Sequence, residues 1–184
     1  MKELSLNILD IAQNSVKAGA AHITITVADE QEQRIISVQD DGCGMSPEFL
    51  AKVSDPFTTT RTTRPVGMGI PLLKLAAEQT GGSVTLASRQ DAGDGVHGTV
   101  ITAVFYREHM DCPPLGDLAS TMVTLIQGNP TLSITLHLSV AGRHKTLSTD
   151  EMRQMLGEEV SLSEPAVLVW AADFINEPDD AGET

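Results

Sequence analysis

Hydrophobic positions at the start of the chain follow a helical period. Leu4, Ile8 and Ile11 fall on one stripe of residues 4–18, which predicts a half-buried helix that ends at Gly19. After it, short segments alternate apolar and polar side chains in the manner of strands, and others carry helix start and stop signals. The predicted strands are 21–27, 35–39, 83–88 and 99–106, and the predicted helices are 46–53 and 71–80.

The order of these elements indicates the fold class. The first two strands are close enough to form a hairpin, and helices separate them from the second pair. This order predicts an α+β fold, specifically a two-layer α/β sandwich in which a mixed, mostly antiparallel sheet has helices on one face.

A domain boundary is predicted near Arg107, because Pro113 and Pro114 interrupt the periodicity. We therefore divide the chain into residues 1–107 and a small C-terminal α/β appendage of unknown role, residues 108–184. The appendage is predicted to contain a helix over 115–126, a strand over 132–140, a helix from a capping box at Ser148 and Glu151 through Leu156, and a helix from Pro165.

The charge and the hydrophobic pattern of the chain limit the partners and the location that we expect. The formal net charge is −13, which disfavours binding along a phosphate backbone, so nucleic acid is not expected as a partner. No run of apolar residues approaches the twenty or so that a membrane helix needs, and the N-terminus resembles no leader. We expect a cytoplasmic protein.

Cys43 and Cys112 follow no metal-binding spacing and are expected to be small buried side chains rather than redox centres.

The first candidate for chemistry is the pair Asp10 and Asn14 on the predicted first helix. Four residues apart, they lie on one helical face. The amide oxygen can ligate Mg²⁺, and the carboxylate can orient or deprotonate a nucleophile. Taken alone, the pair is also compatible with an ordinary solvated helix face.

The second candidate directly follows a predicted strand, as the run Asp40-Asp41-Gly42-Cys43-Gly44-Met45. Its glycines allow a tight turn and close approach of the backbone to a flat ligand. Asp40 can then accept a hydrogen bond from an exocyclic amine, which favours adenine over guanine. A plain Asp-Gly turn remains the alternative.

The third candidate is the threonine-rich stretch after Asp55-Pro56-Phe57, which contains Arg61 and ends at Gly67-Met68-Gly69. Hydroxyl groups, arginines and a glycine turn at a helix N-terminus favour bound phosphate. The stretch resembles a lid over a ligand, and a solvated loop is the alternative.

In this order the motifs resemble the GHKL superfamily of ATPases and kinases, which includes histidine kinases, gyrase and MutL, over residues 4–106. The stretch from Asp10 to Ala20 is similar to the asparagine box, 40–44 and 67–69 to the two glycine boxes, and Gly98-Thr99 to the last motif. The resemblance is strongest to histidine kinase catalytic domains and to stand-alone anti-sigma kinases, and it implies the Bergerat ATP-binding fold with ATP and Mg²⁺ as ligands.

The resemblance also implies individual roles. Asn14 is the magnesium ligand, Asp10 occupies the position of the catalytic base, and Lys17 contacts phosphate. Asp40 reads adenine with support from Thr99. The implied ATP-binding residues are Asn14, Lys17, Asp40, Gly42, Gly44, Met45, Phe57, Arg61, Gly67, Met68, Gly69, Ile70 and Thr99.

Two departures from the family pattern shape the expected function. Hydrolysing members have glutamate where this chain has Asp10, so slow hydrolysis is expected. The chain begins at the asparagine box, without the helical hairpin that bears a phosphoacceptor histidine. We therefore expect a slow ATPase or a kinase of a separate, regulatory protein. A nucleotide-gated binding module is the alternative, and a DNA-repair or topoisomerase fragment ranks third.

Overall fold

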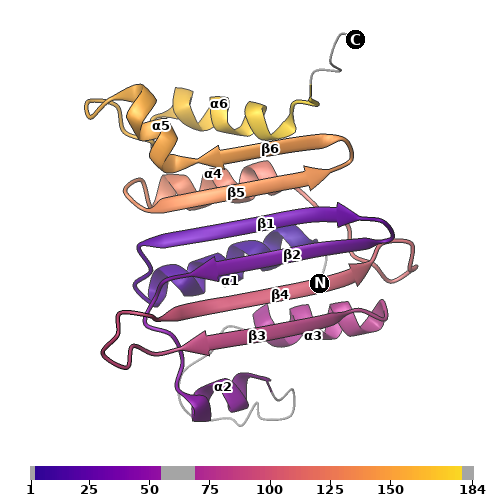
Figure 1. The fold of residues 1–184 in the computed structure, drawn as a ribbon. Helices are drawn as coiled ribbons and strands as arrows, with labels where there is room; N and C mark the ends of the chain where they lie inside the picture. Colours follow the sequence, from indigo (N-terminus) through magenta and orange to yellow (C-terminus); the bar gives the residue numbers. More distant parts are fainter. Residues whose placement is uncertain (1–2, 55–68, 180–184) are drawn as a thin grey trace.

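The computed structural model describes residues 3–54 and 69–179. One six-stranded sheet runs through the molecule in the order β3-β4-β2-β1-β5-β6 (Figure 1). The strands are β1 (His22–Glu30), β2 (Gln33–Asp40), β3 (Ser83–Arg89), β4 (Gly98–Tyr106), β5 (Ser133–Val140) and β6 (Arg143–Ser148). The helices are α1 (Leu4–Lys17), α2 (Pro47–Ser54), α3 (Gly69–Gln79), α4 (Leu118–Gly128), α5 (Thr149–Leu156) and α6 (Pro165–Asn176).

The sheet is mixed, as the sequence predicts. β1 and β2 form the expected antiparallel hairpin, and β2–β4, β3–β4 and β5–β6 are also antiparallel. The one parallel pair joins β1 to β5, from His22 opposite Ser133 to Ala28 opposite Ser139. Both strands of the C-terminal region thus extend the sheet begun by the first hundred residues.

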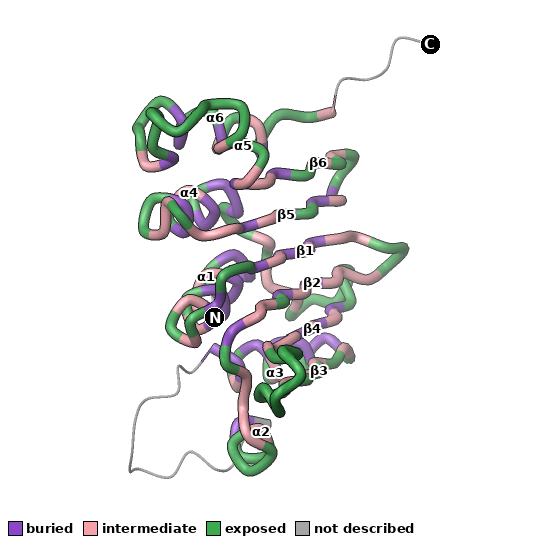
Figure 2. Tube along the Cα trace, turned by 60° about the vertical axis from the view of Figure 1, so that its left-hand side comes forward, coloured by how far each residue is buried: buried purple, intermediate pink, exposed green. Residues whose placement is uncertain are grey.

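The helices α1, α3 and α4 lie side by side behind the sheet (Figure 1). The apolar stripe of α1 is buried against the strands, and buried segments are found where helices and strands face each other (Figure 2). The predicted two-layer sandwich is confirmed. The side chains with least exposure in this core include Leu4, Ile8, Ile23, Ile25, Ile36, Leu73, Phe105, Met122, Leu125, Ile134 and Leu136.

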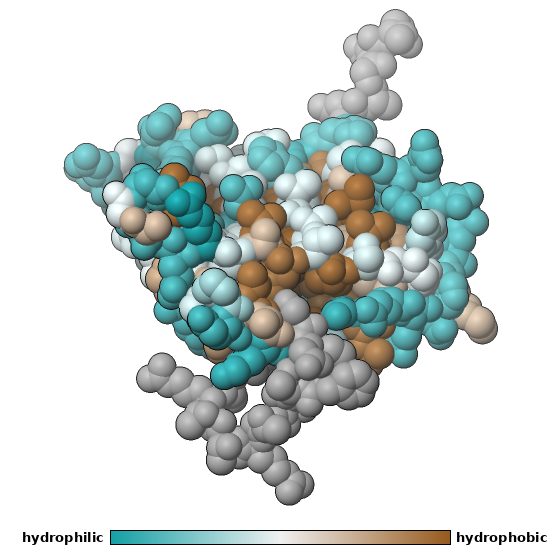
Figure 3. All heavy atoms as spheres, turned by 60° about the horizontal axis from the view of Figure 1, so that its bottom comes forward, coloured by the Kyte–Doolittle hydropathy of each residue, from teal (hydrophilic) through white to brown (hydrophobic). Residues whose placement is uncertain are grey.

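The opposite face of the sheet carries no helix in the described part of the chain. On it, half-buried Ile35, Val100 and Val104 alternate with threonine and serine side chains. When the lower end of the molecule is turned forward, hydrophobic and weakly polar side chains fill the middle of the visible surface, between hydrophilic flanks (Figure 3). The residues of β2 and β4 that point to the open face are therefore mostly apolar or weakly polar rather than charged.

Most elements begin and end within a few residues of their predicted positions. The hydroxyl of Ser46 accepts the N–H of Phe49 at 3.2 Å and so starts α2, as its N-cap chemistry predicts. α4 begins later than expected, because the carboxylate of Asp117 accepts the N–H of Ser120 at 2.8 Å and caps Leu118–Gly128. The predicted boundary near Arg107 lies in the connection between β4 and α4. The division into two domains stays a prediction.

β6 is a strand that the sequence pattern does not predict. Only Leu147 is buried along Arg143–Ser148, so the strand lacks the apolar alternation that signals a strand. The edge of β5 supplies the pairing instead, from Thr135 opposite Ser148 to Val140 opposite Arg143.

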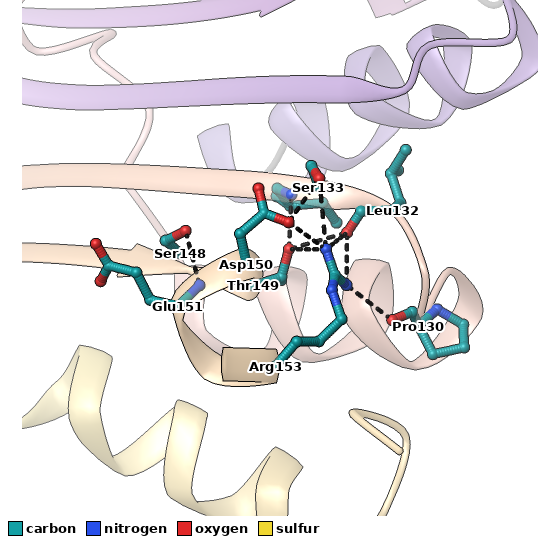
Figure 4. A network of polar contacts seen from close by, with 9 residues as sticks. Pro130, Leu132, Ser133, Ser148, Thr149, Asp150, Glu151 and Arg153 are labelled. Carbon is teal, nitrogen blue, oxygen red and sulfur yellow. Dashed lines mark hydrogen bonds and ion pairs between the residues drawn. The ribbon is translucent and has the colours of Figure 1, made fainter. Parts of the chain in front are cut away.

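Arg153 fastens α5 to the start of β5 (Figure 4). Its guanidinium donates to the carbonyl of Pro130 at 3.0 Å and to the carboxylate of Asp150 at 2.5 Å. The Thr149 hydroxyl accepts the N–H of Ile134 at 2.8 Å. The predicted cap at Ser148 is present, because its hydroxyl accepts the N–H of Glu151 at 3.4 Å.

Candidate functional site

The candidate residues from four elements meet at one end of the sheet, where β2 ends and β4 begins. Asp40 is the last residue of β2 and lies opposite Thr99 of β4, which in turn lies opposite Ser88 of β3. The C-terminal turn of α1 lies beside them, since Ala18 accepts the N–H of Cys43 at 2.9 Å. A row of polar side chains thus crosses three strands beneath α1.

The carboxylate of Asp40 is held by two hydrogen bonds. The hydroxyl of Ser15, on α1, donates to Oδ2 at 2.5 Å, and the N–H of Gly42 donates to Oδ1 at 2.9 Å. Each carboxylate oxygen can accept more than one hydrogen bond, and Asp40 is only partly buried. The side chain is therefore fixed in position while it retains capacity to accept from a ligand.

The backbone around Asp40 can be built only with glycine at two positions. Gly44 has a φ of +67°, and a Cβ there would lie 1.9 Å from the carbonyl oxygen of Arg89. Gly98 has a φ of +134°, and a Cβ there would lie 2.1 Å from the carbonyl oxygen of Asp40. These glycines let β2, β3 and β4 approach one another at the candidate site.

Thr99 supports the site through a neighbour rather than through Asp40 itself. Its hydroxyl lies 2.8 Å from the hydroxyl of Ser88, which also accepts the N–H of Met45 at 2.8 Å. The ring of His97 bonds the carbonyl oxygen of Gly42 at 2.7 Å. The glycine turn is thus held from two sides, and sequence reasoning missed both Ser88 and His97.

The second half of the candidate site is the face of α1 that carries Asp10 and Asn14. A Cβ at Gly69 would lie 2.0 Å from Oδ2 of Asp10, so the carboxylate rests against the first residue of α3. Asn14 lies one turn further on, partly exposed, and its side chain makes no hydrogen bond within the described ranges. Lys17 ends the helix and is exposed.

Asn7 lies on the same face, one turn before Asp10. Its side chain is 3% exposed, and its Oδ1 has no hydrogen-bond partner among the described residues. An unpaired buried amide oxygen is uncommon and costs free energy. In the sequence, Asn7 cannot be told from any other polar position of an amphipathic helix, and it was not predicted as a site residue.

Asp41, next to Asp40, holds the start of β1. Its Oδ1 accepts the N–H groups of Ala21 at 2.7 Å and His22 at 2.8 Å, and its Oδ2 lies 2.7 Å from Nδ1 of His22. Partial burial acts to raise the pKa of Asp41, but the hydrogen bonds from His22 and Ala21 outweigh it and lower that pKa below its usual value. Asp41 therefore stabilises the start of β1, whereas Asp40 beside it is the candidate ligand-binding residue.

Part of the prediction lies outside the described residues. Phe57, Arg61, Gly67 and Met68, with the rest of the threonine-rich stretch, belong to 55–68. Gly69 and Ile70 begin α3 and are both buried, and Met45 packs against the core as a half-buried side chain.

Neither cysteine behaves fully as expected. Cys43 is exposed, so the expectation of a buried side chain is wrong there, because the glycine turn directs it outward. Cys112 is partly buried, and burial raises the pKa of its thiol. Among residues 3–54 and 69–179, no three histidine, cysteine or acidic side chains are grouped to hold a metal ion.

The mixed sheet with helices on one face and the glycine turn after β2 agree with the GHKL-type fold that the motifs in the sequence imply. Residues 2–108 match the family described as histidine kinase-, DNA gyrase B-, and HSP90-like ATPases, and the chain belongs to this family. The resemblance found in the sequence is thereby confirmed.

Known proteins resemble the chain over different extents. The sensor protein SrrB of Staphylococcus aureus is 31% identical over 98 residues, which is 50% of this chain and 17% of SrrB. The ADP-complexed ATPase domain of Aquifex aeolicus MutL superimposes with a TM-score of 0.55 and 14% identity, over 85% of this chain and 68% of that one. The N-terminal domain of a DNA repair protein superimposes with a TM-score of 0.53 and 13% identity, over 95% of this chain and 56% of that one.

At these identities the solved structures show similarity of fold alone. Both superpositions cover more of the chain than residues 2–108, so the similarity of fold reaches into the C-terminal region. Of the helices in the described ranges, none has the length and apolar character that crossing a bilayer requires.

Proposed function

We propose that the chain binds ATP with Mg²⁺ and is either a slow ATPase or a kinase that phosphorylates a separate, regulatory protein. The observation that carries the proposal is the carboxylate of Asp40, held by Ser15 and Gly42 beside a turn that excludes side chains. Membership of the family supports the same reading.

The adenine end of the proposed site is formed by Asp40 and the glycine turn. Asp40 accepts a hydrogen bond from the exocyclic amine of adenine, and its two existing hydrogen bonds keep it oriented before the nucleotide arrives. Gly42 and Gly44 let the turn pack closely against Ala18 and Arg89. Ser88, which bonds Thr99, holds Met45 beside this turn. Recognition therefore relies on a prearranged acceptor.

The phosphate end is formed by α1 and the N-terminus of α3. Asn14 offers an amide oxygen, which suits a hard cation that keeps several waters and is bound mainly by substrate phosphates. Such a site needs no cluster of protein ligands. When bound, magnesium neutralises charge on the phosphate oxygens. Lys17 adds a positive charge at the end of α1, and the first N–H groups of α3 favour phosphate.

Asp10 determines how fast the site turns over. Its carboxylate rests against Gly69, where it can accept a proton from water or from an acceptor hydroxyl. The side chain is one methylene shorter than the glutamate of hydrolysing relatives, which supports slow hydrolysis. Transfer of the phosphoryl group to a partner protein that supplies its own base does not depend on the length of the Asp10 side chain.

Two alternatives remain in the proposal. In a nucleotide-gated module, ATP changes a surface for a partner and turnover is incidental. A DNA-repair or topoisomerase role fits the two superimposed folds but fits poorly with a net charge of −13. The same charge supports a chain that binds neither nucleic acid nor anionic membrane. A cytoplasmic location remains part of the proposal.

Incubation with ATP labelled on the γ-phosphate separates these functions. Free labelled phosphate supports the ATPase, label on a protein encoded in the same operon supports the kinase, and binding without either supports the module. Asp10→Asn is the matched control, since it should abolish turnover and leave binding intact. Absence of ATP binding by the unmodified chain would overturn the proposal.

A further inference from the structure

The outward face of α6 is apolar although nothing in the described chain covers it. Val169 is 59% exposed and Trp170 is 47% exposed. With Ala166 and Asp173 they follow the i, i+3, i+4, i+7 spacing of a single helical stripe, and all four are exposed. The other face of the helix packs against α4 and β6 through Val167, Leu168, Ala171 and Ile175.

Trp170 is supported from beneath. Its ring stacks on Phe174 with 5.4 Å between centroids, and Nζ of Lys145 lies 5.2 Å from the centroid of the Phe174 ring. Lys145 also pairs with Asp179 at 3.2 Å. A large aromatic side chain held in place, yet exposed, provides contact area at low cost in conformational entropy.

The part of the chain that contains α6 is rich in acidic residues. Ten of the 25 acidic residues of the chain lie after Ser148, but only one of its 12 basic residues does, and α6 contains no lysine or arginine. That basic residue, Arg153, is engaged with Asp150 and the backbone of β5. Glu164 and Glu177 flank α6 at its two ends. Two cations also lie beside α6: Lys145, which pairs with Asp179, and Arg143, which donates to the carbonyl of Ile175. Acidic residues nevertheless outnumber basic ones in this part of the chain.

We propose that this stripe of α6, comprising Ala166, Val169, Trp170 and Asp173, docks a basic amphipathic helix of a partner protein. The apolar side of such a helix covers Val169 and Trp170, and its lysines or arginines face the acidic rim. The negative charge of this part of the chain favours a positively charged occupant. A second copy of the chain, with a net charge of −13, repels the same rim, and so do nucleic acid and anionic lipid.

The inference is independent of the proposed nucleotide site. α6 packs on α4 and β6 at one edge of the sheet, whereas the nucleotide residues lie on α1, β2, β4 and the start of α3 (Figure 1). The docking test therefore needs no nucleotide and can fail or succeed irrespective of ATP binding.

Trp170 is the only tryptophan of the chain, so its fluorescence reports on this face alone. The probe is a synthetic helical peptide with leucines on one side and lysines on the other. Titration into the full chain should shift Trp170 emission to the blue and reduce its quenching by acrylamide. A peptide with glutamate in place of each lysine should bind at least tenfold more weakly, and 0.5 M salt should weaken the lysine peptide.

Two substitutions test whether the peptide binds at α6. Val169→Ser should weaken the lysine peptide about fivefold or more, whereas Met110→Ser, which changes an exposed methionine far along the chain, should leave the affinity unchanged. Circular dichroism of both variants checks the fold.

Four results would overturn the proposal. They are peptide binding with no change in Trp170 emission, equal binding of the lysine and glutamate peptides, a blue shift on raising the protein concentration without peptide, and a blue shift with anionic vesicles. The third would assign the face to a second copy, and the fourth to a membrane.

Discussion

At the scale of single residues, the two hydrogen bonds of Asp40 have different origins. The bond from Gly42 is local, two residues along the chain, whereas the bond from Ser15 crosses 25 residues and joins α1 to β2. The local bond follows from the turn. The distant one exists only once the helix has packed on the sheet, so the acceptor is prepared by the fold.

Asp40→Asn should weaken ATP binding by about ten- to a hundredfold. The substitution removes the charge from a hydrogen bond worth roughly 1.5–3 kcal/mol. It also turns an NH₂ group toward donors that need an acceptor. Calorimetric titration with ATP and Mg²⁺ measures the loss, and Asp111→Asn, at an exposed position, is the control. An unchanged affinity would remove Asp40 as the adenine reader.

Asn7→Leu should leave the free energy of unfolding unchanged or raise it. Leucine has the same branching and the same number of side-chain heavy atoms, and it removes the cost of an unpaired buried amide oxygen, about 1–3 kcal/mol. Urea denaturation measures the difference. Ile8→Ala, at the adjacent buried position, should instead cost about 2–5 kcal/mol. A loss of more than about 1 kcal/mol in Asn7→Leu would mean that the amide has a structural partner.

The candidate site residues are easier to recognise in the sequence than the side chains that hold them in place. Asp40 and Asn14 are recognisable because each stands at a defined place in a motif, after a strand or on a helix face. Ser88, His97 and Asp41 act through contacts between segments that are distant in the chain, such as the bond from His97 to Gly42. No local pattern distinguishes a serine in such a contact from any polar residue of an alternating strand.

At the scale of elements, Asp41 joins the end of β2 to the start of β1. Asp41→Ala should lower the free energy of unfolding by about 1 kcal/mol near pH 7, since two N–H groups and the His22 ring lose their acceptor. The pKa of Asp41 is lowered in the folded state, so its ionised form stabilises the fold above the unfolded pKa of about 3.9. That contribution disappears as pH falls through the folded pKa.

Denaturation at several pH values tests whether the contribution of Asp41 to stability decreases on acidification. The difference between Asp41→Ala and the unmodified chain should be constant above about pH 5 and shrink progressively below about pH 4. Asp41→Asn, which keeps an acceptor for the two N–H groups, should lose less stability. A deficit that grows on acidification would contradict the assignment.

Elements with strong internal patterns were predictable, and elements defined by their neighbours were not. α1 and the β1–β2 hairpin follow from apolar spacing within the segment itself. β6 carries one buried apolar side chain and exists because β5 presents an unpaired edge. The parallel pairing of β1 with β5 joins segments about a hundred residues apart, which turn chemistry does not specify.

At the scale of the whole molecule, the shared sheet bears on the predicted boundary near Arg107. Leu4 donates its N–H to Pro114 at 2.9 Å, and Ser5 donates to Leu115 at 2.8 Å, so the first turn of α1 is fixed by residues beyond that boundary. α4 packs directly on α1. The C-terminal region thus covers both an edge and a side of the first hundred residues.

A chain that ends at Glu108 should therefore be less stable than the full chain and prone to association. Without β5, β1 becomes an edge strand that carries Ile23, Ile25 and Val27, and unpaired edges of this kind promote aggregation. Thermal unfolding by circular dichroism should show a lower, broader transition, and size-exclusion chromatography should show oligomers. Adding residues 109–184 as a separate polypeptide should restore part of the stability, because the parallel pairing of β1 with β5 can re-form. A monomeric, cooperatively folding 1–108 chain with the melting temperature of the full protein would instead establish Arg107 as the end of an independent domain.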